Sequence, residues 1–489
     1  MLLNFIFIFS LFHSAFFSTD SVEKSKPIPV IYSSPKKELR TKNNFSDTTK
    51  YVVINAINIT GNKITKRSII KRELNFSVGD TLLEKNISQV IKSAKENLLN
   101  TSLFNFATIE TARDSSNKIT INIVLAERWY TWPQPLFSVD ATNFNTWWLT
   151  KDFSKINYGL YLLRYNFLGR NQTIGIRWQD GYDQQFGVFY TIPYINKKEN
   201  SGFGFSVVYA RNHETDYATE NNVLKYYNDA NGYARKNFYT QINYSNRQGI
   251  YNHYSAEVRY NKCSITDSLQ SLASDYFSEN STTMNFFSAD ASFTSDHRDS
   301  KPYPLKGYLL GIGITKLGLG IQQNTNLDVF YIEASAKKYW KLSNRFYFSS
   351  ALKGKFSDNN LQPYYVERAL GYSNYVRGYE YFVINGQDFG LMKNELRYEI
   401  IKPRVEKIKF LKWDKFNKPY FAVYAGIFSD IGYVQDNENY MYNSLANSWL
   451  YGTGVGLDLT TYYDGVFRIE YSVNRQMQSG IFLHFTAPL

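Results

Sequence analysis

The chain has 489 residues, 17% of them aromatic, and its mean hydropathy is −0.40. Beyond the N-terminus no stretch approaches the roughly 20 consecutive apolar residues of a membrane-spanning helix, which excludes a helical membrane protein. The single Cys263 excludes a disulfide framework and a cysteine-based metal cluster, and five scattered histidines argue against a histidine metal site. A net charge of +12 fits an anionic lipid surface, a nucleic acid or neither, and the sign alone does not distinguish these alternatives.

The N-terminal segment has the length and apolar character of a signal peptide. Residues 1–18 read MLLNFIFIFSLFHSAFFS and end in small residues, although no Lys or Arg precedes the apolar run. We therefore expect export, with an uncleaved anchor as the alternative. Residues 19–50 are rich in Ser, Lys, Asn and Pro without periodicity, which predicts a linker.

Residues 51–127 predict a small α+β module of the form β-α-α-β-β. The expected elements are strands at 51–60, 104–112 and 119–125, a helix capped by Thr65, and a second helix from Leu83 to Leu98. The module contains no catalytic constellation. Its sheet edge has the capacity to pair with an extended guest peptide through main-chain hydrogen bonds, and a purely structural spacer is the alternative.

Residues 128–489 alternate apolar and polar side chains with period two, in segments of about ten residues separated by turn-forming clusters. Aromatic residues gather near the expected strand ends, as at a membrane interface. At roughly 20 to 24 residues per strand and connection, this region predicts an antiparallel transmembrane β-barrel of about 16 strands. A soluble β-sandwich would instead hide the apolar face in a core, and alternation alone leaves it open.

Two short motifs in the second half carry the candidate site. The first lies on a long expected loop and consists of Val376, Arg377, Gly378 and Tyr379. The second lies on the expected strand at 420–434 and consists of Phe428, Asp430 and Gly432, which the alternation turns toward the lumen. An unpaired carboxylate in a half-dry interior is costly, so an arginine brought in on a loop is a suitable partner. The neighbouring strand also turns Glu395 and Glu399 inward as candidate second partners.

Together the two motifs resemble the outer-membrane assembly-factor superfamily, which includes BamA, TamA and the two-partner-secretion transporters. Further matching segments are SDHRDSKPYPLKG, with Asp296, Arg298, Asp299, Pro304 and Gly307, the glycine-rich run YGTGVGLDL at 451–459, and the module at 51–127, which resembles a POTRA domain. In that family the loop folds into the barrel and its arginine contacts the lumenal acid. The resemblance therefore implies a loop lock between Arg377 and Asp430.

The resemblance also implies a function without a cofactor. We expect a bacterial outer-membrane protein with its POTRA module in the periplasm, which inserts or translocates unfolded outer-membrane or secreted client proteins and contacts outer-membrane lipid and helper lipoproteins. The alternatives are a secretion pore that threads an unfolded partner protein, or a passive porin or barrel enzyme. No catalytic motif, metal site or nucleic-acid patch is found, and the lone lumenal His484 is expected to hydrogen-bond in a polar wall.

The barrel closure is expected to be weak. Pro133 and Pro135 lack an N–H in the first strand, and the last strand continues past Phe485 into residues 486–489. A weak closure suits lateral opening, and it is also what an ordinary frayed terminus gives. The chain further departs from the family in having one POTRA-like module rather than several, which leaves insertion and secretion both open.

Overall fold

A computed structural model describes residues 50–114, 117–139, 156–229, 232–277, 280–358, 362–407, 413, 416–437, 443–461 and 463–485. The expected signal peptide and nearly all of the expected linker lie outside these residues. The described chain divides into two compact units between Arg128 and Trp129. Within the described residues, no helix has the length and apolar character needed to cross a bilayer.

The first unit is a four-stranded sheet with helices. Its elements are β1 (Tyr51–Thr60), α2 (Arg67–Arg72), β2 (Thr81–Leu83), the 3₁₀ turn η1 (Glu84–Asn86), α3 (Ile87–Asn100), β3 (Phe104–Arg113) and β4 (Lys118–Glu127). The strand order is β2-β1-β4-β3, and β1 runs parallel to β4. Buried side chains alternate along β4 because one face of the sheet packs on the helices, as the period-two pattern predicts.

Two local predictions in this unit are wrong. The second helix begins at Ile87, because residues 81–83 form β2 and pair with the start of β1. Thr65 does not cap the first helix, whose N-cap is Lys66 without a side-chain hydrogen bond. The Thr65 hydroxyl instead donates to Glu127 Oε1 at 2.7 Å, and the Thr65 N–H donates to the same oxygen. Both errors arise from contacts between residues far apart in the sequence.

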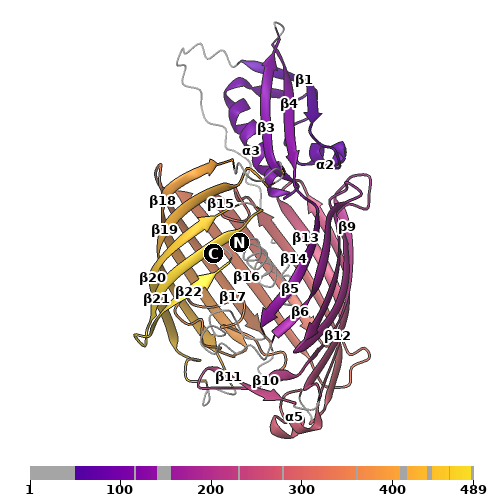
Figure 1. Ribbon diagram of the computed structural model, residues 1–489, viewed down its shortest axis with the longest axis vertical. Coiled ribbons are helices and arrows are strands. Elements are labelled where there is room, and N and C mark those ends of the chain that lie inside the picture. The colour runs from indigo at the N-terminus through magenta and orange to yellow at the C-terminus, as the bar shows by residue number, and fades with distance from the viewer. Residues whose placement is uncertain are drawn as a thin grey trace, which may run out of the picture. The chain divides into compact units, whose positions relative to one another are not determined.

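The second unit is a 16-stranded antiparallel sheet that curls into a barrel (Figure 1). Its strands are β5 (Thr131–Val139), β6 (Ile156–Phe167), β7 (Gln172–Gly181), β8 (Asp183–Ile192), β9 (Ser201–Asn212), β12 (Arg235–Gln248), β13 (Asn252–Ile265), β14 (Thr283–Asp296), β15 (Gly307–Leu317), β16 (Val329–Lys341), β17 (Phe346–Ser357), β18 (Asp388–Val405), β19 (Tyr420–Gln435), β20 (Trp449–Thr460), β21 (Val466–Asn474) and β22 (Ser479–His484). A separate hairpin, β10 (Glu214–Glu220) with β11 (Val223–Asn228), follows β9, and the short helix α5 (Asp267–Leu272) follows β13.

The two faces of the barrel wall differ as the alternation predicts. On the outer face, apolar side chains such as Val455 and Ile481 are exposed by 53% and 67%, which suits contact with lipid. On the inner face, Asp458 and Glu470 are exposed by at most 1%. A β-sandwich would bury the apolar face of each strand in its core. Because that face is exposed here, the structure excludes a β-sandwich.

The barrel has one irregular boundary, between its first strand β5 and its last strand β22, which we call the seam. Within the described residues no ladder joins β5 to β22, whereas every other pair of neighbouring barrel strands is hydrogen-bonded. Pro133 and Pro135 lie on β5, at the end of the strand order where proline is tolerated. The Trp132 ring of β5 packs edge-on against Tyr463, in the connection between β20 and β21, with the ring centroids 5.2 Å apart. The expected chain extension at 486–489 lies outside the described residues.

Candidate functional site

The connection between β17 and β18 folds against the inner wall of the barrel, and its described part comprises residue 358 and residues 362–387. Apolar side chains hold it there: Val376 and Tyr379 are each 1% exposed and pack in one cluster with Val434 of β19 and Leu450 of β20. Tyr379 also donates its hydroxyl to Gln476 Oε1 at 2.9 Å. The loop is therefore a packed part of the interior, and we call residues 362–387 the lumenal loop.

Arg377 is the centre of the loop contacts and is 0% exposed. Its Nε and Nη2 donate to the two oxygens of Asp430 at 2.8 and 2.5 Å, and its backbone N–H donates to the same carboxylate at 3.1 Å. Its Nη1 donates to Glu395 Oε2 at 2.9 Å. The guanidinium carbon also lies 3.9 Å from the ring centroid of Phe428, within reach of a cation–π interaction. A buried charge is tolerated when it is paired and hydrogen-bonded, as Arg377 is by its bidentate contact with Asp430.

Glycines in the wall and in the loop make this close approach possible. A Cβ at Gly452 of β20 would lie 1.7 Å from the carbonyl oxygen of Arg377, so the loop backbone occupies the space of that missing side chain. A Cβ at Gly432 would lie 2.6 Å from Val376. Gly378 has a φ of +94°, a conformation that residues with a side chain rarely adopt. β20, the glycine-rich strand, is thus a surface on which the lumenal loop docks.

The ion pair of Arg377 belongs to a larger buried network on adjacent strands. Glu395 of β18 also accepts from Arg397 Nε at 3.0 Å and from Arg468 Nη1 at 2.9 Å. Arg468 of β21 in turn contacts Asp458 of β20 at 2.9 Å. None of these four side chains is more than 2% exposed. Charges at successive inward positions of neighbouring strands therefore form one connected cluster.

A turn between β14 and β15 reaches the same network with the motif SDHRDSKPYPLKG. Asp299 holds the turn, because its Oδ1 accepts from the backbone N–H groups of Leu305 and Lys306. Tyr303 then donates its hydroxyl to Asp458 Oδ2 at 2.6 Å, across 155 positions of sequence. The turn and the lumenal loop thus meet the same set of wall charges.

The β10–β11 hairpin fastens the lumenal loop and the β19–β20 connection to each other. Asn222 at its tip is 4% exposed and has a φ of +65°, and its carbonyl accepts from the Val383 N–H at 2.8 Å. Its side chain donates to Ser444 Oγ at 2.9 Å and accepts from the Leu445 N–H at 3.0 Å. The hairpin thus helps to fix the lumenal loop in place, in addition to the apolar cluster and the hydrogen bonds of Arg377.

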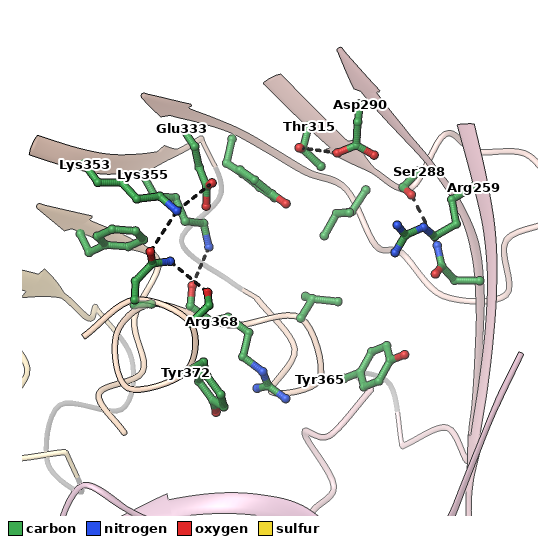
Figure 2. A pocket seen from close by; sticks show the side chains of 18 of the residues that line it. Arg259, Ser288, Asp290, Thr315, Glu333, Lys353, Lys355, Tyr365, Arg368 and Tyr372 are labelled. Atoms are coloured by element: carbon green, nitrogen blue, oxygen red, sulfur yellow. Dashed lines mark hydrogen bonds and ion pairs between the residues drawn. The ribbon is translucent and has the colours of Figure 1, made fainter. Parts of the chain in front are cut away.

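Part of the interior beside the loop is a cavity of about 510 Å³, lined by the loop and by β13 to β18 (Figure 2). Its lining is polar and charged. Lys353 Nζ lies 3.9 Å from Glu333 Oε2, and Lys355 donates to the backbone carbonyl of Arg368 on the loop at 3.0 Å. The lumenal loop therefore occupies the lumen only in part.

The structure brings together the residues of both sequence motifs, with Glu395 as a further contact of Arg377. Glu399, the other candidate partner, instead accepts a hydrogen bond from the Tyr347 hydroxyl at 3.3 Å. Sequence reasoning missed the roles of Arg468, Asp458 and Tyr303. The alternation along β20 and β21 predicts that Asp458 and Arg468 point inward, but the residues that they contact depend on the register between the strands.

Comparisons with known proteins agree with this architecture. Residues 166–485 match the Omp85 superfamily domain, and residues 52–128 match the POTRA family described as surface antigen variable number repeat. A search of curated proteins returned no match.

Solved structures similar to the chain include BamA from Haemophilus ducreyi lacking POTRA domains 1–3 and CdiB from Escherichia coli. The first has 14% identity and a TM-score of 0.49, over 89% of this chain and 83% of that one. The second has 10% identity and a TM-score of 0.47, over 90% of this chain and 91% of that one. Since the superfamily domain covers well over half of the sequence, the chain belongs to the Omp85 superfamily.

Proposed function

We propose that the protein inserts client proteins into the bacterial outer membrane, with its POTRA unit in the periplasm. The observation that carries this proposal is the seam, where the edges of β5 and β22 have no ladder between them within the described residues. An open strand edge presents main-chain donors and acceptors that an extended client strand can pair with, whatever its sequence. A client that joins this edge enters lipid with its backbone groups satisfied.

The POTRA unit supplies a second edge for client capture. β3 ends the strand order of its sheet, and from Thr108 onward most of its side chains are exposed. Pairing by main-chain hydrogen bonds suits a receptor for many different clients. In this mechanism a client strand pairs first with β3 and then with the seam, and the lock around Arg377 keeps the wall next to the seam in shape. Outer-membrane lipid and helper lipoproteins are the further partners that we propose.

Photocrosslinking tests capture at β3. We place a photoreactive amino acid at Thr108 or Glu110 on β3, and at Lys92 on the exposed face of α3 as the control. We expect unfolded outer-membrane proteins to crosslink at the β3 positions and not at Lys92. Equal yields at all three positions would contradict capture by strand pairing.

Disulfide closure tests the seam. Cysteine pairs are introduced in β5 and β22 on a Cys263→Ser background, and the control pair replaces Ala336 and Leu352, which face each other on β16 and β17. Oxidation of the seam pairs should stop accelerated insertion of unfolded barrel proteins into liposomes, and reduction should restore it. Oxidation of the control pair should change nothing. Full activity with an oxidised seam would overturn the insertion mechanism.

A secretion pore is the second candidate, and the polar cavity beside the lumenal loop favours it. Release of the loop would join this cavity to the space that the loop occupies, and a channel lined by charged side chains would follow. Planar-bilayer recording distinguishes the two functions. Large steady conductance without insertion of barrel proteins supports the pore, whereas insertion with low conductance supports the first proposal.

A further inference from the structure

Three side chains from separate segments meet at the inner wall beside the lock. Glu380 follows Tyr379 on the lumenal loop, Glu470 lies on β21, and His484 is the last residue of β22. One donor atom from each lies within 4.8 Å of the others. His484 Nε2 is 3.3 Å from Glu470 Oε1 and 3.8 Å from Glu380 Oε1.

Each carboxylate is oriented by a hydrogen bond that its Oε2 accepts. Glu380 Oε2 accepts from the Gly378 N–H at 2.8 Å, and Glu470 Oε2 accepts from Arg468 Nε at 2.6 Å. Both Oε1 atoms therefore point toward the imidazole. Ligating carboxylates in metal sites are held in this way: a hydrogen bond fixes one oxygen, and the other oxygen faces the metal.

The imidazole is oriented in the same way. His484 Nδ1 lies 3.2 Å from the Tyr375 hydroxyl, and the two rings stack with their centroids 5.6 Å apart. A neutral imidazole that donates from Nδ1 to Tyr375 keeps a lone pair on Nε2, the atom that faces the two carboxylates.

The atoms of Glu470 and His484 that face each other are not joined by a hydrogen bond of normal geometry. Glu470 is 1% exposed and its Oε1 lies 3.3 Å from His484 Nε2, yet within the described residues neither atom has a hydrogen-bond partner. Arg468 pairs with Glu470 through Oε2, so the two Oε1 atoms and the imidazole nitrogen together form a site that attracts a cation.

We propose that Glu380, Glu470 and His484 bind a divalent transition-metal ion of the Zn²⁺ class. An imidazole nitrogen with two carboxylate oxygens suits such an ion better than Ca²⁺ or Mg²⁺, which favour oxygen ligands alone. Zinc bonds of about 2.0 to 2.2 Å place neighbouring tetrahedral ligands about 3.4 Å apart, close to the separations here. Three protein ligands leave a fourth position for water.

The bound ion would join the lumenal loop to the last strand. Glu380 belongs to the loop, whereas His484 ends β22, whose outer edge forms the seam. β22 pairs with β21 only from Arg468 opposite His484 to Val473 opposite Ser479. The metal would therefore strengthen the attachment of a short strand at the place where the seam opens.

Metal binding is measured on the purified full chain in detergent after chelator treatment. Zn²⁺ alone is the probe, and competition with a chromogenic chelator gives its affinity and stoichiometry. We expect one high-affinity Zn²⁺ per chain. Glu470→Gln and His484→Asn should each lower the affinity more than about 100-fold, and Tyr375→Phe should lower it about 10- to 100-fold, as the loss of an orienting partner does.

Matched variants on β13 control for nonspecific effects. Glu257→Gln and His253→Asn remove a carboxylate and an imidazole away from the cluster and should keep full Zn²⁺ affinity. Heat-modifiable gel mobility shows that each variant folds, and Co²⁺ absorption in the visible range reports coordination in those that do. Absence of tight Zn²⁺ binding, or unchanged affinity in folded His484→Asn and Glu470→Gln, would overturn the proposal.

Discussion

Replacement of Arg377 by methionine is the sharpest test of the lumenal lock. Methionine keeps an unbranched apolar stem but removes all three side-chain hydrogen bonds to Asp430 and Glu395. The two carboxylates are affected unequally. Glu395 retains Arg397 and Arg468 at 3.0 and 2.9 Å, whereas Asp430 loses its bidentate partner.

The cost of the substitution follows from the burial of Asp430, which is 2% exposed. Removing one partner of a buried ion pair typically costs about 3–5 kcal/mol, because the remaining charge stays in a poorly solvated site. The loop can relieve this cost by leaving the wall. We therefore expect the ratio of docked to undocked loop to fall by about 10²- to 10⁴-fold.

Amide hydrogen exchange measures this ratio. Peptides from residues 362–387 should exchange faster in Arg377→Met by the factor given above, while those from β12 and β13 keep their protection. Arg404→Met is the matched control, because that side chain is 55% exposed and its guanidinium contacts the exposed Glu406 and the Phe421 ring, away from the lumenal loop. Adding Asp430→Asn to Arg377→Met should restore about 1–3 kcal/mol of loop docking, since the carboxylate that lost its arginine partner is then removed. Loop protection within about threefold of the parent protein, in a folded Arg377→Met barrel, would refute the reasoning.

Two further substitutions test the surfaces on which the lock depends. Gly452→Ala places a Cβ 1.7 Å from the Arg377 carbonyl oxygen, so it should undock the loop in the same exchange assay, while Gly390→Ala, whose Cβ would have no atom within 4 Å, should not. Tyr303→Phe removes the 2.6 Å hydrogen bond to Asp458 and should destabilise the barrel by about 1.5–3 kcal/mol, seen as a lower midpoint in heat-modifiability gels; an unchanged midpoint would contradict a charge-assisted bond.

The architecture was predictable where it depends on local pattern. Period-two alternation is a property of each strand alone, so the sixteen strands and their inner and outer faces follow from the sequence. The start of α3 was misplaced because β2 exists only through its pairing with β1. The helical periodicity of a segment contains no information about a strand that pairs with it from elsewhere in the chain.

The candidate site was predictable only in part. Parity turned Asp430 and Glu395 inward, and the resemblance to a known superfamily supplied Arg377 as their partner. The hydrogen bond from Tyr303 to Asp458 and the ion pair between Arg468 and Glu395 join segments 155 and 73 positions apart. Such contacts depend on strand register and on the path of the turns, which no single-strand pattern contains.

The position of the network within the wall bears on the seam opening that we propose. Its charges lie on β18, β19, β20 and β21, so ion pairs brace four consecutive strands against one another in addition to their ladders. β22 contributes none of these ion pairs and reaches the network through His484 alone, which lies 3.3 Å from Glu470; it is six residues long and pairs with β21 alone among the described strands. Because opening requires strands that separate at low cost, β22 is the strand from which it should begin. The lock on the loop would then serve to keep the neighbouring wall rigid while its last strand moves.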